Sequence, residues 1–369
     1  MINLTRMQKL MDDEGVKAVI ATSVENVYHS TGNYNGLLRL LPERPSYAVF
    51  PRDDEPVYLV NAIEEDFAKK ESWIKDIRSW RIGKSPAMVL FDILKEKRVL
   101  DGKIALEFLA LPSVFYREIA SLASKTVFVE AAKVFNKLRE IKEKREIDIL
   151  TSGARAQRKA IEGAFALAEP GWTEKDISEM IGQRMLSAGF DEIGWRTVET
   201  GTGTLSIHEL PTERKLQMGD VVRADCGGRI KGYYSDLARM AVVGKPSKRQ
   251  KEIYKALVLA QKETINNMKV GVKISDIYNV CKKTFEQNCD GKFFFPHIGH
   301  GLGVILHDDP QMFPDNEERL EENMIINLEP VYVDPGVATY HVEDLIWVSS
   351  DGPKVLTGKL PDEELFVIT

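Results

Sequence analysis

The chain has 369 residues, 43% of them hydrophobic and 29% charged, which is enough to fill the cores of two domains. Its 50 basic and 56 acidic residues give a net charge of −6, and the basic residues are scattered, which argues against a nucleic-acid surface. No stretch reaches the ~18 consecutive apolar residues of a membrane span. The amino terminus carries acidic residues where a signal peptide needs an apolar segment. Three cysteines are too few for a disulfide framework, which favours a reducing compartment. Together, these features predict a cytoplasmic protein without membrane or nucleic-acid partners.

Helix and strand patterns alternate from residue 1 to about 130. Apolar residues at helical spacing predict a helix that begins near Leu4 and ends at Gly15. A second helix is predicted at 87–97, and strands are predicted at 18–21, 47–50, 57–60 and 103–108. We therefore predict an α/β domain at 1–130. It contains no Gly-rich phosphate loop, so a nucleotide is not indicated.

A charged segment at 137–161, KLREIKEKREIDILTSGARAQRKAI, follows. Its apolar residues, Leu138, Ile141, Ile147, Leu150 and Ala154, fit the inner face of one solvated helix that leads into a second domain at 131–369.

Two segments of the second domain, 100 residues apart, are similar. Gly171 precedes Asp176 and Gly271 precedes Asp276 at the same offset, and each aspartate begins a predicted helix. Thr173 and Asp176 have the spacing of a capping box. Chance can produce so short a match, but two similar halves would place a site between them.

Two aspartates flank a predicted hairpin turn in VVRADCGGRIKGYYSDLARM, residues 221–240. Asp225 and Asp236 are equidistant from a point inside GRIKG, so a hairpin turning there would set them opposite each other. Two carboxylates that close repel each other unless a cation or a proton lies between them. The alternative is that both decorate an exposed hairpin.

Two glutamates repeat this arrangement in NMIINLEPVYVDPGVATYHVEDLIWVS, residues 323–349. Glu329 and Glu343 are equidistant from Gly336, and each lies in an otherwise apolar predicted strand. Burying two glutamates among such neighbours is costly without compensation, which a pair of metal ions would supply.

Three of the six histidines lie between these hairpins in FFFPHIGHGLGVILHDDP, residues 293–310. They are His297, His300 and His307. His300 stands between two glycines, which let the backbone approach a bound group closely. Neutral imidazole is a common metal ligand, although a single histidine in a strand is more often structural.

Four carboxylates and one histidine form an oxygen-rich donor set that suits two divalent ions such as Mn, Co, Fe or Zn. A pair of such ions activates water and polarises the carbonyl that the water attacks. Thiolates are absent from the set, which disfavours a structural zinc site.

These residues resemble those of the pita-bread metallopeptidases, which include methionine aminopeptidase, aminopeptidase P and prolidase. The shared features are Asp, eleven residues, Asp, then GHG, LEP and VED, in this order. The resemblance implies an α+β fold, with a pita-bread catalytic domain of internal pseudo-twofold symmetry behind a smaller creatinase-like α/β domain. It implies that the metal ligands are Asp225, Asp236, His300, Glu329 and Glu343.

The resemblance also implies catalytic roles. His307 would contact the scissile peptide and the tetrahedral intermediate, and His208 matches the family's upstream substrate histidine. Glu329 would in addition move a proton from the attacking water to the leaving amine. In the first domain, ENVYHSTG and YAVFPRDDEP are similar to the amino-terminal module of prolidase, aminopeptidase P and creatinase.

Three positions depart from the family pattern. Glu209 follows the upstream histidine where glycine is usual, and Asp308 follows His307 where glutamate is usual. His341 stands two residues before the last metal-binding glutamate, where many prolidases have arginine. These positions concern the substrate pocket and leave the metal ligands intact.

The sequence thus predicts a metal-dependent peptidase that removes the amino-terminal residue of a small peptide, with an Xaa-Pro dipeptidase or aminopeptidase as the leading hypothesis. One alternative is a metal-dependent hydrolase of a non-peptide C–N bond in a small metabolite. An alternative of another class is an inactive binding module, which the complete ligand set disfavours.

The family commonly forms homodimers, and the leucine-rich stretch at 25–45 is expected near the partner's pocket. Its leucines, Leu37, Leu38, Leu40 and Leu41, could equally pack inside their own domain.

Overall fold

The computed structural model describes residues 2–369. The chain divides into two compact units, Met1–Arg139 and Glu140–Thr369, whereas the sequence suggested a division near 130. The difference arises because Val134, Phe135 and Leu138 are buried in the core of the first unit. Across residues 2–369, no helix is long and apolar enough to cross a membrane.

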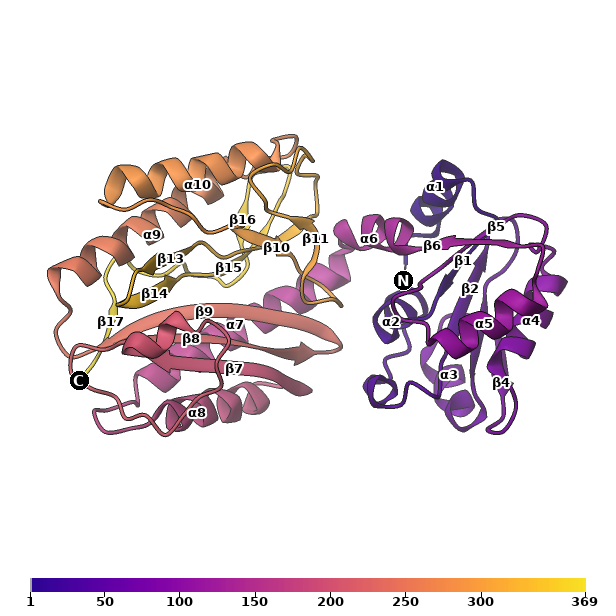
Figure 1. Cartoon of the computed structure of the whole chain (residues 1–369), viewed down its shortest axis with the longest axis horizontal. Helices are drawn as coiled ribbons and strands as arrows, with labels where there is room; N and C mark the ends of the chain where they lie inside the picture. Colours follow the sequence, from indigo (N-terminus) through magenta and orange to yellow (C-terminus); the bar gives the residue numbers. More distant parts are fainter. Residues whose placement is uncertain (1) are drawn as a thin grey trace. The chain divides into compact units, whose positions relative to one another are not determined.

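The first unit is built on a six-stranded mixed sheet of order β4-β3-β2-β1-β5-β6 (Figure 1). Its strands are β1 (Ala18–Ala21), β2 (Tyr47–Pro51), β3 (Val57–Asn61), β4 (Asp76–Trp80), β5 (Lys103–Leu106) and β6 (Val127–Glu130). Its helices are α1 (Leu4–Glu14), α2 (Val24–Thr31), α3 (Glu65–Glu71), α4 (Pro86–Glu96), α5 (Ser113–Leu122) and α6 (Ala132–Glu140), with short 3-10 turns η1 (Gly36–Leu40) and η2 (Ala62–Glu64).

Every element predicted in this unit is present. Asn3 caps α1, and Gly15 ends it with a left-handed φ of 64° that suits glycine. The sequence analysis did not predict the edge strands β4 and β6, which are short and largely only partly buried. The segment ENVYHSTG forms most of α2.

The charged segment at 137–161 does not form one helix, as predicted, but two. Helix α6 ends at Glu140, and helix α7 (Lys144–Phe165) begins after a break of three residues. The backbone N–H of Lys142 donates to the carbonyl of Asn323, which fixes the break within the second unit. A capping box between Glu143 and Glu146 then starts α7. One face of α7 is deeply buried, so it is a core helix and not the solvated helix that we expected.

The second unit contains a four-stranded sheet of order β17-β9-β8-β7, a five-stranded sheet of order β11-β10-β12-β15-β16, and the hairpin β13-β14. Its remaining helices are α8 (Glu174–Ser187), α9 (Lys248–Asn267) and α10 (Ile274–Asn288), with the 3-10 turn η3 (Gly201–Leu205). Its strands are β7 (Glu192–Thr200), β8 (Val221–Ile230), β9 (Tyr233–Val243), β10 (Gly299–Gly301), β11 (Asp308–Gln311), β12 (Ile325–Leu328), β13 (Val331–Asp334), β14 (Ala338–His341), β15 (Asp344–Trp347), β16 (Lys354–Val355) and β17 (Phe366–Ile368).

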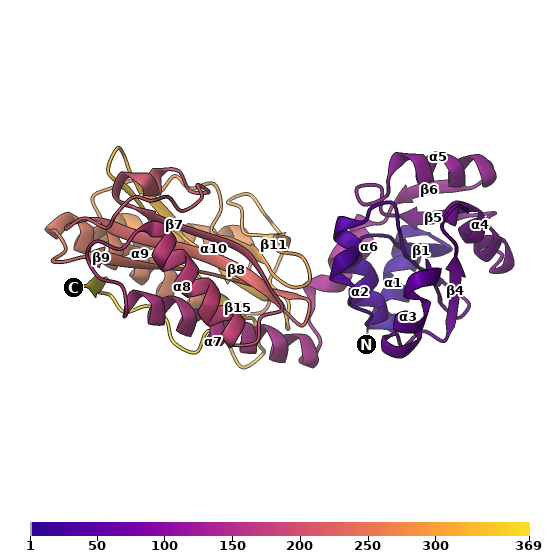
Figure 2. The same cartoon turned by 90° about the horizontal axis from the view of Figure 1, so that it is seen from below.

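The strands of this unit form an inner layer between two helix pairs (Figures 1 and 2). Helices α7 and α8 share one apolar core with β8 and β9. Helices α9 and α10 share another core with the strands of the five-stranded sheet and the hairpin β13-β14. Because the helices cover the outer faces, polar side chains on the inner faces meet between the two halves.

The internal pseudo-twofold expected from the sequence is present. Helices α8 and α10 begin three residues after Gly171 and Gly271, whose φ values are 100° and 87°. An isolated bridge precedes each helix, Thr173 with Lys215 and Lys273 with Arg319. The capping box of Thr173 and Asp176 is also present. The short repeat therefore marks two structurally similar halves.

Candidate metal centre

Strands β8 and β9 bring the two aspartates to one face of the four-stranded sheet. Asp225 pairs with Ala238 and Asp236 with Gly227, so the aspartates are diagonal neighbours and not directly opposite, as the sequence suggested. The turn does fall inside GRIKG, as expected, but it centres on Lys231 and Gly232, both with positive φ, which is one residue beyond the midpoint of the two aspartates. The strand pairing is shifted by two residues from the one expected. Because side chains alternate between faces with a period of two, both carboxylates still lie on the same face of the sheet.

The two glutamates lie where two strands of the second half are interrupted. Glu329 falls between β12 and β13, and Glu343 between β14 and β15, so neither lies inside a continuous strand. Leu328 pairs with Asp344 on one side of the break and Val331 with His341 on the other. Because the same register holds on both sides, Glu329 and Glu343 face each other across the gap. Their symmetric placement about Gly336 was read correctly from the sequence.

His300 lies on β10 between Gly299 and Gly301, and neither glycine leaves room for a side chain. A Cβ on Gly299 would lie 2.2 Å from the carbonyl oxygen of Asn327, and one on Gly301 would lie 2.1 Å from that of Asp309. Nδ1 of His300 contacts the carbonyl of Gly301 at 2.9 Å, which makes it the donor and leaves Nε2 as the acceptor. Nε2 lies 3.4 Å from Oε1 of Glu329 and 3.7 Å from Oδ2 of Asp236.

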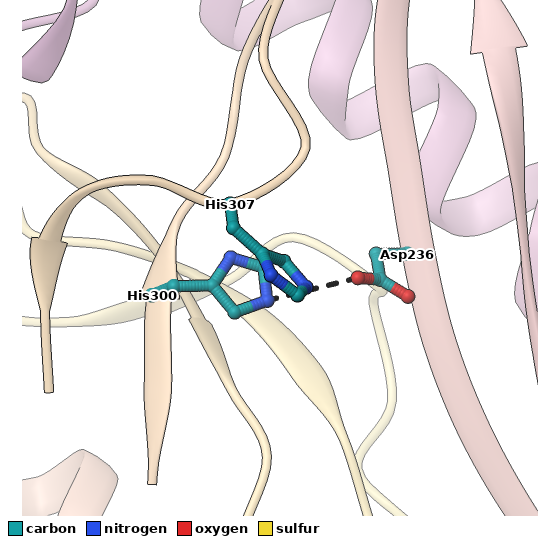
Figure 3. A group of neighbouring side chains, drawn as sticks. All are labelled: Asp236, His300 and His307. Carbon is teal, nitrogen blue, oxygen red and sulfur yellow. Dashed lines mark ion pairs between the residues drawn. The ribbon is translucent and has the colours of Figure 1, made fainter. Parts of the chain in front are cut away.

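The five predicted ligands converge in overlapping groups, each with donor atoms within 4.8 Å of one another. The groups are Asp225, Asp236 and Glu343; His300, Glu329 and Glu343; and Asp236, His300 and His307. Figure 3 shows the third group, in which the rings of His300 and His307 lie together and Asp236 faces them from β9. The two ring centroids are 4.3 Å apart. Residues more than 100 positions apart in the chain thus share one centre.

Burial makes the charged state of these carboxyl groups unfavourable. It raises the pKa of Asp236, Glu329 and Glu343 well above their ordinary values, and repulsion from neighbouring carboxylates raises each pKa further. Burial lowers the pKa of His300 to about 3, and the charge of His307 adds to this effect, so the imidazole of His300 is neutral. Neutral imidazole is the form that binds a metal ion.

These residues fit divalent cations. Nε2 of His300 and Oε2 of Glu343 are buried and have no hydrogen-bond partner within residues 2–369. Buried polar atoms without partners are costly, and a cation would satisfy them. It would also remove the repulsion among the carboxylates, and a set of four carboxylates and one imidazole suits hard or borderline divalent ions.

The two substrate histidines predicted from the sequence lie at the exposed side of the centre. His307 and His208 are both solvent-exposed. The charge of His208 contributes to lowering the pKa of both His307 and His341, which indicates that the three rings share one environment.

The three positions that depart from the family pattern differ in depth. Glu209 is exposed, and Asp308 is buried, with its Oδ1 accepting from the backbone N–H of Asp309. His341 is buried against the centre, with Nε2 3.4 Å from Oε2 of Glu329 and Nδ1 3.8 Å from Oδ2 of Asp225.

Sequence reasoning gave no role to four residues that contact the predicted ligands. Trp195 donates its indole N–H to Oδ1 of Asp225, and Asn327 donates its amide to Oε1 of Glu343. Nδ1 of His297 lies 3.5 Å from Oε1 of Glu329. Arg223 contacts Oδ2 of Asp225 at 3.3 Å. Arg223 carried a signal, because an arginine within the apolar run VVRADC needs a buried partner.

An inner layer of strands with this ligand set at its centre defines a metal-dependent hydrolase with the pita-bread fold. The chain belongs to metallopeptidase family M24, whose model matches residues 148–350. The creatinase/prolidase N-terminal domain matches residues 3–141.

Known proteins resemble the chain over almost its whole length. It is 25% identical over 355 residues to an Xaa-Pro dipeptidase of Pyrococcus furiosus, with 96% of this chain and 97% of the relative covered. A dipeptidase structure from Pyrococcus horikoshii matches with a TM-score of 0.89 at 25% identity, over 99% of both chains. An Xaa-Pro dipeptidase structure from Bacillus anthracis shares the fold with a TM-score of 0.89 at 23% identity, over 99% of both chains.

Proposed function

We propose that the protein hydrolyses the amino-terminal peptide bond of small peptides whose second residue is proline, with two divalent ions bound at the centre. The observation that carries the proposal is the convergence of five buried or partly buried donors beside two exposed histidines. Two relatives that match nearly the full length of this chain are named Xaa-Pro dipeptidases. Their names support peptides with proline in the second position as the substrate class.

The roles of the residues follow from their positions. Divalent ions held by Asp225, Asp236, His300, Glu329 and Glu343 would activate water and polarise the scissile carbonyl. The carboxylate of Glu329, which is only partly buried, would accept a proton from the attacking water and pass it to the leaving nitrogen. The exposed imidazole of His307 would donate a hydrogen bond to the oxygen that gains charge, and His208 would orient the peptide.

Comparison of peptides tests the proposal. The purified protein, loaded with Mn²⁺ or Co²⁺, is incubated with Xaa-Pro and Xaa-Ala dipeptides and with Xaa-Pro-Yaa tripeptides. We expect preferential cleavage of an Xaa-Pro bond, and the relative rates on dipeptide and tripeptide separate a dipeptidase from an aminopeptidase. A metal-loaded enzyme that cleaves none of these peptides would refute the peptide substrate and favour a metabolite with another C–N bond.

We further propose that the protein is a cytoplasmic homodimer that uses manganese or cobalt. The three unpaired cysteines support a reducing compartment. In the stretch at 25–45, Leu38 is buried in its own domain, but Leu37 is 58% and Leu40 77% exposed. A partner subunit would cover these two leucines.

A further inference from the structure

Arg223 is the largest side chain that is fully buried in the described part of the chain. It lies on β8, two residues before Asp225, and therefore on the same face of the sheet as that predicted ligand. A buried guanidinium is costly unless each of its donors has an acceptor. Its partners therefore reveal which groups it holds in place.

All five N–H groups of Arg223 have an acceptor. One edge donates to both carboxylate oxygens of Glu199 on β7, from Nε at 3.1 Å and from Nη2 at 2.8 Å. Nη2 also donates to the carbonyl of Ile207, next to His208. Nη1 lies 3.3 Å from Oδ2 of Asp225 and 3.3 Å from Nδ1 of His341. Glu199 thus anchors one edge of the guanidinium of Arg223, and the other edge faces the predicted metal centre.

The contact with Arg223 also determines the tautomer of His341. A guanidinium donates only, so Nδ1 of His341 must accept and its proton must lie on Nε2. Nε2 is 3.4 Å from Oε2 of Glu329, the carboxylate that moves a proton in the proposed function. Arg223 therefore orients the donor of His341 towards Glu329.

We propose that Arg223 is a positioning residue of the active site, which holds Asp225, the backbone beside His208 and the tautomer of His341 in one arrangement. The arginine that many prolidases have at position 341 is absent here, and a guanidinium reaches His341 from β8 instead. The effect on kcat that we predict for Arg223 variants rests on the proposed function.

Arg223→Lys tests the proposal, because lysine keeps the charge but loses the planar fork. In enzyme saturated with metal we expect kcat to fall by about 10-fold or more, with KM little changed. Amide hydrogen exchange is a second readout that needs neither metal nor substrate. Residues 205–210 should exchange faster in the variant, because the carbonyl of Ile207 loses its donor.

Arg229→Lys is the matched control. Arg229 lies on the same strand and is also buried, but its carboxylate partner is Glu192, at 3.1 Å, and not a predicted ligand. We expect normal kcat and normal exchange at 205–210. A folded, metal-loaded Arg223→Lys enzyme with wild-type kcat and wild-type exchange would overturn the proposal.

Arg223→Gln keeps the proposal testable if Arg223→Lys does not fold. Its uncharged amide replaces the guanidinium fork, so we expect the same loss of kcat and the same faster exchange at 205–210. A folded, metal-loaded Arg223→Gln enzyme with wild-type kcat and wild-type exchange overturns the proposal. If the wild-type enzyme cleaves no peptide, the proposed function fails, while the exchange of 205–210 still decides the role of Arg223.

Discussion

Trp195 donates its indole N–H to Oδ1 of Asp225 over 3.0 Å, so a residue of β7 orients a predicted metal ligand on β8. The ring has room because Gly227 lies beneath it, where a Cβ would come within 1.9 Å of the ring. Residues that hold ligands in this way typically change metal affinity by ~10–100-fold. Trp195→Phe should therefore weaken metal binding by about 10-fold or more, measured by titration calorimetry with Mn²⁺.

Trp347→Phe is the control for this substitution. The indole of Trp347 also donates one hydrogen bond, at 3.1 Å, but its acceptor is Asn323, which is not a predicted ligand. We expect wild-type metal affinity in this variant. Equal affinities in the wild type and both variants would mean that the indole of Trp195 does not orient Asp225.

Asp236→Ala should abolish activity and metal binding without loss of the fold. Asp236 is buried beside other carboxylates, and burial with their repulsion raises its pKa. Removing it relieves that repulsion, so the metal-free variant should unfold at no lower temperature than the metal-free wild type. Elemental analysis, turnover and a thermal melt in chelator measure the three effects. A variant that retains full turnover would contradict the ligand assignment.

The carboxylates among the predicted ligands stand out in the sequence because each pair is symmetric about a turn. Glu329 and Glu343 do face each other about Gly336, as expected. For Asp225 and Asp236 the same reasoning missed the register by two residues, because the turn at Lys231 and Gly232 is chosen by backbone conformation and not by carboxylate spacing. The face was still correct, because strand residues alternate with a period of two.

The residues around the ligands could not be read in this way. Trp195, Arg223 and Asn327 reach the centre through contacts between strands, and a sequence shows no such contact unless the register is known. The break before α7 was missed for a related reason. The helical pattern runs through Ile141, and the strand pairing of Ile141 with Met324 interrupts it.

His307 and His208 should affect chemistry and not metal binding. Alanine at either position should lower kcat by ~10²-fold or more, because a donor to the developing charge or to the bound peptide is lost. Metal content should stay at the wild-type level, since both side chains are exposed beside the buried donors. His307 is the stricter test, because its ring lies 4.3 Å from that of His300. Loss of metal in His307→Ala would make it a ligand.

Glu199 should give the protein a pH-dependent stability. Burial raises its pKa to about 7, although Arg223 opposes the shift. The ordinary pKa is 4.5, so the folded state binds the proton more tightly than the unfolded state does. This contribution to stability is fully present below pH ~4.5 and is lost as the pH rises through ~7.

Glu199→Gln tests this assignment, because glutamine does not titrate. The free energy of unfolding of the metal-free wild type, relative to that of the variant, should fall between about pH 5 and about pH 8. Denaturant titrations at both pH values measure the difference. A difference that is constant or rises with pH would mean that Glu199 is ionised throughout and that Arg223 outweighs its burial.

Leu40→Asp tests the proposed dimer. Leu40 lies at the end of η1 and is 77% exposed, so a charge there should not harm its own domain, whereas a partner surface would have to bury it unpaired. We expect a weaker dimer by light scattering and, because the stretch at 25–45 is proposed to border the partner's pocket, a raised KM. Leu109→Asp is the control, because Leu109 is fully exposed in the same unit but outside that stretch.

Leu38 is unsuitable for this test, since it is buried in its own domain and aspartate there would disturb the fold. A wild-type protein that is monomeric and fully active at micromolar concentration would refute the dimer. A stable dimer that Leu40→Asp leaves intact, with unchanged KM, would place the subunit contact elsewhere on the surface.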